Sequence, residues 1–191
     1  MALPLLSSFK SKLANGGGAA RPNLFKVSIK NTPKGALSLA KDEEILVKAT
    51  SIPASTIAAA PITYGGRPLK YAGFRTYDNW STTIINDEDF GVRKSLEQWL
   101  SLLSNHELNT RSEELTGNLE GENAGYKQDI SVTQFSKNGK SLHTYKFIGA
   151  FPTALSTIAL SWESNSIETY TCSWAYDKWE RKESLSSEEV G

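Results

Sequence analysis

Residues 80–103 read "WSTTIINDEDFGVRKSLEQWLSLL", and the spacing of their apolar side chains changes part-way through. Up to residue 85 the pattern has a period of two, with Trp80, Thr82 and Ile84 on one side, which is typical of a strand with one buried face. Val92, Leu96, Trp99 and Leu103 then recur at spacings of four, three and four. That spacing places them on one face of a helix. The stretch therefore predicts a strand followed by a long amphipathic helix.

Three acids, Asp87, Glu88 and Asp89, lie between this strand and this helix. A metal cage or a catalytic carboxylate cluster would need further ligands aimed at the same point, and the sequence identifies none. The N-terminus of a helix favours acids, because its backbone N–H groups are unpaired and its dipole is positive there. We therefore interpret the three acids as capping residues of the helix N-terminus.

The rest of the chain is mostly strand-like and turn-rich. Further strands are predicted at residues 23–30, 43–53, 74–86, 126–136, 141–151, 157–162 and 167–179. The Gly65–Gly66 pair marks a hairpin turn or a bulge, and Asn138–Gly139 suits a type I′ hairpin turn. Helices and strands do not alternate, so βαβ units are not expected. The predicted fold is mainly β, an antiparallel β-sandwich or half-barrel with one amphipathic α-helix packed against it.

The chain divides into a central domain and two extensions. Residues 1–19 form an N-terminal arm, in which residues 7–15 could make a short helix that the glycines at 16–18 end. Residues 20–180 form the β domain, with a polar, exposed loop at residues 111–125. Residues 181–191 form a polar C-terminal tail.

Composition excludes several classes of function. Hydrophobic residues make up 39% of the chain, enough for a core, and 21 basic residues balance 21 acidic ones. A protein that grips nucleic acid through phosphates usually carries a basic excess. The single cysteine favours a reducing compartment. The apolar run near the N-terminus is too short for a signal peptide or a membrane span, so no membrane anchor is expected.

The sequence predicts no catalytic residue, cofactor site or metal site. His106, His143 and Cys172 could supply three zinc ligands, but they lie far apart and form no short-range metal pair. Nucleophile-elbow, P-loop and dinucleotide-binding motifs are absent from the sequence. Lys26 and Lys30 make a modest basic line on the first strand, which a solvated face explains as well as a phosphate contact does.

The order of four motifs, rather than any one of them, carries a family resemblance. They are "ARPNLFKV", "ATSIPAS", "FRTYDNWSTTIINDEDFGVRKSLEQWLSLL" and "FIGAFPTALSTIALSWESNSIETYTCSWAYDKWE". From about Ala20 to Glu180 this series resembles the tail tube proteins of contractile-tailed bacteriophages. That family is related to the inner tube proteins of bacterial contractile injection systems.

The resemblance implies a structural protein without catalysis or cofactors. Subunits of that family form hexameric rings, and the rings stack into a hollow tube inside a contractile sheath. The implied partners are other copies of the chain, the sheath protein, and the baseplate and tail-terminator proteins. Double-stranded DNA would pass through the channel without specific binding. The implied location is the virion, with assembly in the cytoplasm of the host bacterium.

Contacts between subunits are expected to concentrate in residues 53–68. Pro53, Ile57, Pro61 and Tyr64 lie in this segment, whose small apolar residues have too little bulk to fill a core alone. The alternative is an ordinary packed hairpin. A charge at Ile57 is expected to impair ring stacking and to leave the monomer folded. The N-terminal arm and the tail past Trp179 are secondary candidates for contact between rings.

Three other functions stay open at this point. One is the inner tube of a bacterial injection system, whose cargo is protein. A second is a single-strand-binding β-barrel that stacks bases on Trp162, Trp174 and Trp179, although core or interface packing also explains these residues. A third is an enzyme on an all-β scaffold, for which the sequence shows no acid–base constellation.

Overall fold

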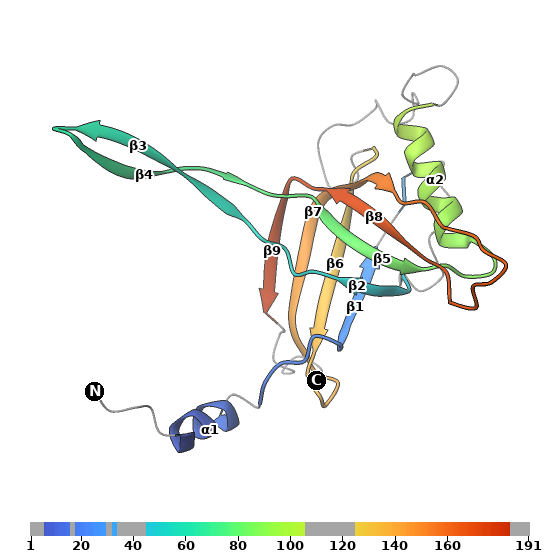
Figure 1. The fold of residues 1–191 in the computed structure, drawn as a ribbon, viewed down its shortest axis with the longest axis horizontal. Helices are drawn as coiled ribbons and strands as arrows, with labels where there is room; N and C mark the ends of the chain where they lie inside the picture. The colour runs from blue at the N-terminus through green and yellow to red at the C-terminus, as the bar shows by residue number, and fades with distance from the viewer. Residues whose placement is uncertain (1–5, 16–17, 30–31, 34–44, 106–124, 184–191) are drawn as a thin grey trace, which may run out of the picture.

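The structure is a computed structural model that describes residues 6–15, 18–29, 32–33, 45–105 and 125–183 (Figure 1). In chain order its elements are α1 (Leu6–Asn15), β1 (Phe25–Ile29), β2 (Val47–Thr50), β3 (Thr56–Tyr64), β4 (Arg67–Thr76), β5 (Trp80–Ile85), α2 (Gly91–Leu103), β6 (Gln128–Phe135), β7 (Ser141–Leu155), β8 (Thr169–Ala175) and β9 (Lys178–Glu183). Figure 1 shows strands curled into a body, with α2 against one side and the β3–β4 hairpin projecting far from it.

Seven strands form one antiparallel sheet in the order β1-β6-β7-β8-β5-β2, and β9 pairs with β7 beside this path. The long strand β7 joins the two halves: its first part pairs with β6 and β9, and its last part pairs with β8. Near β1 and β2, the two ends of the path, the Ile45 N–H donates to the Val27 carbonyl over 3.3 Å. The predicted antiparallel half-barrel with one packed helix is confirmed.

The core lies inside this curled sheet and beneath α2. Trp80, Trp99 and Trp174 are its largest side chains, with ring centroids 6.3 Å apart for Trp80–Trp174 and 5.8 Å apart for Trp99–Trp174. Leu96 and Trp99 are fully buried, as the helical spacing predicts. The Trp99 indole N–H donates to the Tyr126 carbonyl over 2.9 Å, so the helix is also tied to the chain entering β6.

A glycine allows β7 to change partners in mid-strand. Gly149 has a φ of 68°, in the left-handed region that favours glycine. A Cβ atom there would collide with the carboxylate of Asp177, whose backbone N–H donates to the Ile148 carbonyl over 3.0 Å. The strand therefore bends at a place where the neighbouring chain leaves no room for a side chain.

We expect Gly149→Ala to lower the free energy of unfolding by about 1–2 kcal/mol, because alanine is strained in the left-handed conformation, whereas the exposed Asp177 carboxylate can move aside. Gly91→Ala is the matched control, since a Cβ there would have its nearest contact at 3.6 Å, an ordinary van der Waals distance. Denaturant unfolding of both variants measures the difference. Equal free energies of unfolding for Gly149→Ala and Gly91→Ala would contradict the requirement for glycine at position 149.

Several predicted strand boundaries are wrong. The predicted strand at 74–86 is divided between the end of β4 and β5, with residues 77–79 in neither. Residues 157–162 contain no strand, and β7 instead runs on to Leu155. Proline usually ends a strand. Pro152 nevertheless lies within β7, at the point where the β7–β8 register shifts and where β6 no longer pairs with β7. The predicted strand at 167–179 is divided into β8 and β9, which pair with different parts of β7 on either side of Gly149.

Both predicted hairpins are present, and one has a different turn. Gly65 and Gly66 both have positive φ, as a two-residue type I′ turn between β3 and β4 requires. In the β6–β7 turn Gly139 has positive φ but Asn138 does not. That turn is therefore not type I′, and its glycine follows the pattern of a longer loop with a bulge.

The extensions are described only in part. Helix α1 lies apart from the body in Figure 1, with its described side chains exposed. The predicted loop at 111–125 falls outside the described residues except for Gly125. The strand β9 continues to Glu183, so regular structure extends past the predicted start of the tail at residue 181.

Candidate assembly surface

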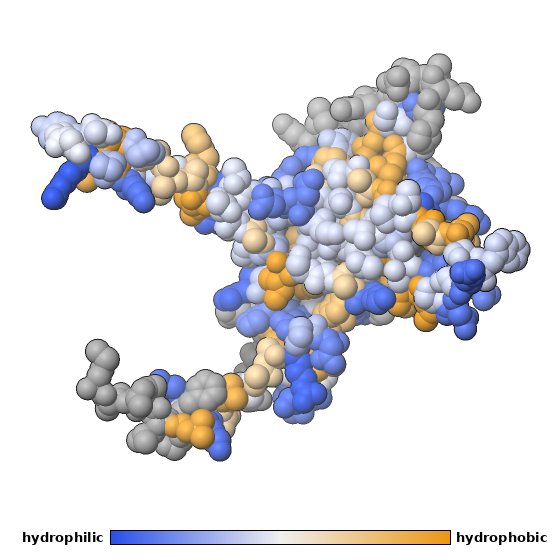
Figure 2. All heavy atoms as spheres, in the orientation of Figure 1, coloured by the Kyte–Doolittle hydropathy of each residue, from blue (hydrophilic) through white to orange (hydrophobic). Residues whose placement is uncertain are grey.

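The β3–β4 hairpin carries more exposed large hydrophobic side chains than any other element of the described chain. All residues of both strands are exposed, and the pairing register places Ala60 opposite Tyr71, Ile62 opposite Leu69 and Tyr64 opposite Arg67 on one face. Apolar side chains along it are visible in Figure 2. A two-stranded hairpin is marginally stable alone, and exposed apolar patches mark interaction sites. The hairpin thus has the properties of a segment that docks on another surface.

The structure separates the four predicted contact residues. Pro53 precedes β3 and is half-buried, whereas Ile57, Pro61 and Tyr64 are exposed on β3. Successive residues of a strand face opposite sides. Pro61 and its register partner Lys70 therefore lie on the face of the hairpin opposite to Tyr64. Sequence reasoning missed the β4 side of the hairpin, including Phe74, which is 91% exposed.

The seven-stranded sheet also leaves edges open. Among the described residues β1, β2 and β9 each have one strand partner. The base of the hairpin is tied to the β9 edge, because the Trp179 indole N–H donates to the Ala54 carbonyl over 3.2 Å. Open edges favour pairing with another chain, and natural proteins cover or pair them.

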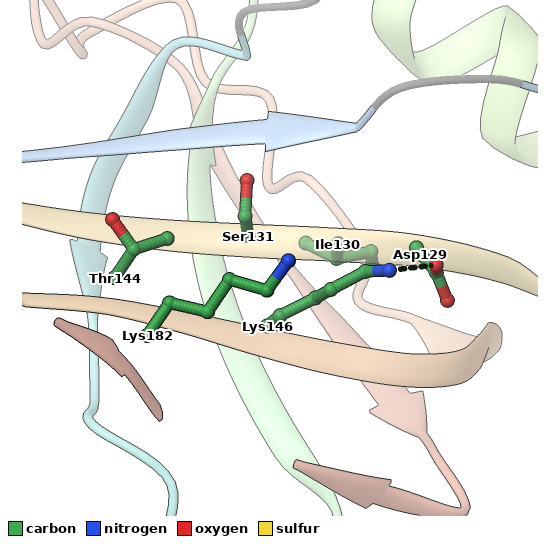
Figure 3. Close-up of a pocket in the computed structure, with 6 residues that line it drawn as sticks. All are labelled: Asp129, Ile130, Ser131, Thr144, Lys146 and Lys182. Carbon is green, nitrogen blue, oxygen red and sulfur yellow. Dashed lines mark ion pairs between the residues drawn. The ribbon is translucent and has the colours of Figure 1, made fainter. Parts of the chain in front are cut away.

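The outer face of the β1-β6-β7-β9 part of the sheet is polar. Hydroxyl pairs cross it, with Ser28 and Ser131 oxygens 2.8 Å apart and Thr133 and Thr144 oxygens 3.1 Å apart. A cavity of about 150 Å³ opens on this face, lined by Asp129, Ile130, Ser131, Thr144, Lys146 and Lys182 (Figure 3).

Carboxylates partner two of the lysines on this polar face. The Lys146 ammonium is 2.7 Å from Asp129, the ion pair drawn in Figure 3, and the Lys178 ammonium is 2.8 Å from Glu180. The hydrogen bond and charge of Glu180 raise the pKa of Lys178, and those of Lys178 lower the pKa of Glu180. Two lysines of the face, Lys146 and Lys178, therefore have local counter-charges, and they lie beside neutral hydroxyl groups and Lys182.

A second exposed apolar surface lies at the far side of the body. Between β7 and β8, residues 156–168 carry Leu160, Trp162 and Ile167, which are 81%, 106% and 75% exposed. The backbone of this loop is fixed at its base, where the Ser156 N–H donates to the Thr171 carbonyl and the Thr171 N–H donates to Ser156 Oγ, each over 2.8 Å. A tryptophan without cover on an anchored loop is typical of an interface residue.

The structure corrects the predicted role of Asp87, Glu88 and Asp89. Helix α2 begins at Gly91, its N-cap residue Phe90 has a φ of 54°, and no side chain makes a capping hydrogen bond. The acids occupy the preceding turn, which the Phe90 N–H closes onto the Asp87 carbonyl over 3.0 Å. Because Phe90 intervenes, their carboxylates precede the first turn. A favourable effect of their charge on the helix dipole stays a prediction.

The candidate chemical residues do not form a reactive site in the described chain. His143 lies on β7, Cys172 is buried on β8, and His106 falls outside the described residues. Within the described residues, no group of three or more His, Cys, Asp or Glu side chains could hold a metal ion. In the same part of the chain, no helix is long and apolar enough to cross a membrane. Trp174 is 1% exposed, so it cannot stack on a nucleic-acid base as the single-strand-binding alternative requires.

Burial of two acidic protons predicts a loss of stability at high pH. Burial raises the pKa of the Cys172 thiol and of the Tyr170 hydroxyl above their ordinary values of 9.0 and 10.0. The unfolded chain therefore releases these protons first, so the free energy of unfolding falls as pH rises above 9.0. Denaturant unfolding on both sides of that pH measures this, and in Cys172→Ala the fall should begin nearer 10.0. If the free energy of unfolding depended on pH identically in the wild type and in Cys172→Ala, Cys172 would not contribute to the loss of stability.

A sequence model of the family described as "Phage tail tube protein" matches residues 20–182. The chain belongs to the phage tail tube protein family. The tail tube protein gp19 of Enterobacteria phage T4 is 32% identical to it over 166 residues, which are 86% of this chain and 93% of the relative. A tail tube protein of Serratia phage KSP90 is 25% identical over 90% of this chain and 93% of the relative.

Solved structures of related machines share the fold of this tail tube chain. The tube-terminating cap of the anti-feeding prophage has a TM-score of 0.61 at 17% identity, covering 96% of this chain and 95% of that one. A chain of the sheath–tube complex of an extracellular contractile injection system, PVC, has a TM-score of 0.58 at 18% identity, covering 95% and 99%. At such identities the likeness shows a common fold for tail tube proteins and these chains.

Proposed function

We propose that this chain is the structural subunit of a contractile phage tail tube, in which hexameric rings stack into a hollow tube inside a sheath. Membership of the tail tube family over residues 20–182 carries the proposal. The exposed hairpin and the open edges of β1, β2 and β9 support it, because a polymer would cover both.

The same proposal assigns the other partners and the location. The sheath, baseplate and tail-terminator proteins contact the tube, the tube is part of the virion, and assembly takes place in the host bacterial cytoplasm. Solved structures with this fold include a sheath–tube complex, a baseplate and a sheath/tube terminator. The chain has no catalytic role in this account.

The polar face of the β1-β6-β7-β9 sheet is the proposed lining of the channel. A conduit for DNA must not retain it, and an excess of unpaired lysines would bind phosphate. Hydroxyl groups and carboxylate-partnered lysines, such as Lys146 with Asp129, avoid strong retention. Double-stranded DNA would then pass without specific binding.

The inner tube of a bacterial contractile injection system is the second candidate. The shared fold with chains of such systems favours it. The relatives at 32% identity are phage proteins, which favours the phage tail.

The N-terminal arm is a proposed contact between rings. Leu6 and Leu13 of α1 are 67% and 44% exposed, and a helix of this length is not stable without a surface to lie on. We expect deletion of residues 1–19 to lower the fraction of protein that sediments as tubes. A full-length Leu13→Ser variant should show a smaller loss. Unchanged sedimentation after the deletion would remove the arm from the interface.

Negative-stain electron microscopy of the purified protein tests the proposed function. We expect rings or hollow rods, formed spontaneously or on an added baseplate seed. A single-strand-binding module would instead show featureless particles and salt-sensitive oligonucleotide binding.

A further inference from the structure

The two exposed apolar surfaces carry opposite charge. The hairpin, residues 56–76, contains Arg67, Lys70 and Arg75 and no acid. The β7–β8 loop, residues 156–168, contains Glu163 and Glu168 and no base. Opposite charges around apolar centres are the arrangement that protein interfaces use for orientation and specificity.

More acids adjoin the loop. The Asn86 N–H donates to the Glu168 carbonyl over 3.0 Å, and the Asn86 side-chain amide donates to the Glu168 carboxylate over 2.9 Å. These bonds hold the turn with Asp87, Glu88 and Asp89 against the loop. Phe90, which is 39% exposed, adds to its apolar side chains. The turn that carries these acids thus adjoins the Glu168 end of the loop.

The two surfaces cannot meet within one molecule. Figure 1 shows the hairpin projecting from one side of the body and the β7–β8 loop at the opposite side, beside the start of α2. A contact between them must therefore join two copies head to tail. Repeated contacts of this kind close into rings or continue as filaments.

We propose that the β3–β4 hairpin of one copy docks on the β7–β8 loop of another copy, with its apolar face on Leu160, Trp162 and Ile167. Arg67, which is on that apolar face, lies toward the acids of the loop and of the adjoining turn, whereas Lys70 lies on the opposite face of the hairpin. This inference rests on the proposed function, because the contact forms only in the polymer. In this contact the hairpin has a specific partner surface, and the exposed Trp162 becomes buried.

Crosslinking in assembled tubes tests the contact directly. Tubes are formed from a mixture of two full-length variants, Tyr64→Cys and Trp162→Cys, with one of them tagged, and treated with a short bismaleimide. We expect a crosslinked species that contains both variants. Asn138→Cys, equally exposed but on the β6–β7 turn, replaces Trp162→Cys as the control and should give none. The native Cys172 is buried and does not compete.

Charge reversal provides a second test. Arg67→Glu and, separately, Glu163→Lys should each raise the concentration needed for assembly by about tenfold, and the loss should shrink at high salt. A chain that carries both changes should recover assembly, because it restores opposite charges.

The outcomes separate this contact from the proposed function. Normal tube formation by the wild type, together with no crosslink in the mixed cysteine tubes or no recovery of assembly in the Arg67→Glu/Glu163→Lys chain, overturns the hairpin–loop contact and leaves the tube subunit intact. Crosslinking of Trp162→Cys to an added sheath protein instead of the hairpin also overturns it. Wild-type protein that forms no tubes even on a preformed seed overturns both.

Discussion

We expect Ile62→Asp to abolish tube assembly while leaving the monomer as stable as the wild type. Ile62 is 57% exposed and lies opposite Leu69 on the apolar face of the hairpin, so the monomer loses almost no buried surface. In a polymer the same face would be covered, and an unpaired carboxylate there would cost several kcal/mol. By the alternation along β3, Ile57 lies on the opposite face with Pro61 and Thr63, so Ile57→Asp tests that face separately.

Thr63→Asp is the matched control for this prediction. Thr63 adjoins Ile62 on β3, is also exposed, and lies on the opposite face of the hairpin, where Pro68 is its register partner. Thr63→Asp introduces the same charge as Ile62→Asp, so any general electrostatic effect occurs in both variants. Sedimentation and negative stain measure assembly, and circular dichroism measures folding. Ile62→Asp tubes in wild-type yield would remove the apolar face of the hairpin from the interface.

Trp174→Ala should lower the free energy of unfolding by about 3–5 kcal/mol, the range for removing a large buried aromatic side chain. Trp174 is 1% exposed, packs against Trp80 and Trp99, and donates its indole N–H to Thr82 Oγ1 over 2.9 Å. The substitution leaves a cavity and removes the donor to Thr82. Because domains have only about 5–15 kcal/mol of stability, the variant would be close to unfolding.

Trp162→Ala separates the two roles of tryptophan in this chain. Trp162 is fully exposed, so its removal should change the free energy of unfolding by less than about 0.5 kcal/mol. The hairpin–loop contact predicts that the same variant assembles poorly. Denaturant unfolding and sedimentation of both variants make the comparison. A Trp174→Ala protein within about 1 kcal/mol of the wild type would contradict the account of the core.

The sequence predicts well those elements whose side chains pack within the monomer. The face of α2 with Leu96 and Trp99 and the alternation in β8 both follow from burial inside one chain, and periodicity reports burial directly. The hairpin turn at Gly65 and Gly66 follows from local backbone preference, which requires no partner, whereas the type I′ turn predicted at Asn138–Gly139 does not form.

The predictions fail where the partner of a segment lies outside the monomer. Residues 157–162 alternate as a strand does, but Leu160 and Trp162 face solvent, only Ile158 packs against the core, and no strand of the described residues pairs with the segment. Alternation indicates an apolar face and does not say what covers it. The assignment of Asp87, Glu88 and Asp89 as capping residues is wrong for a different reason. The left-handed conformation of Phe90 shifts the start of α2, and periodicity carries no signal for it.

Cryo-electron microscopy of material assembled from the purified chain tests the central claim most directly. The account predicts hollow rods of stacked six-fold rings, in which the hairpin of each subunit is buried against another copy and the sheet edges are paired. Isolated monomers with a solvent-covered hairpin, found even in the presence of a preformed baseplate–tube seed, would contradict it.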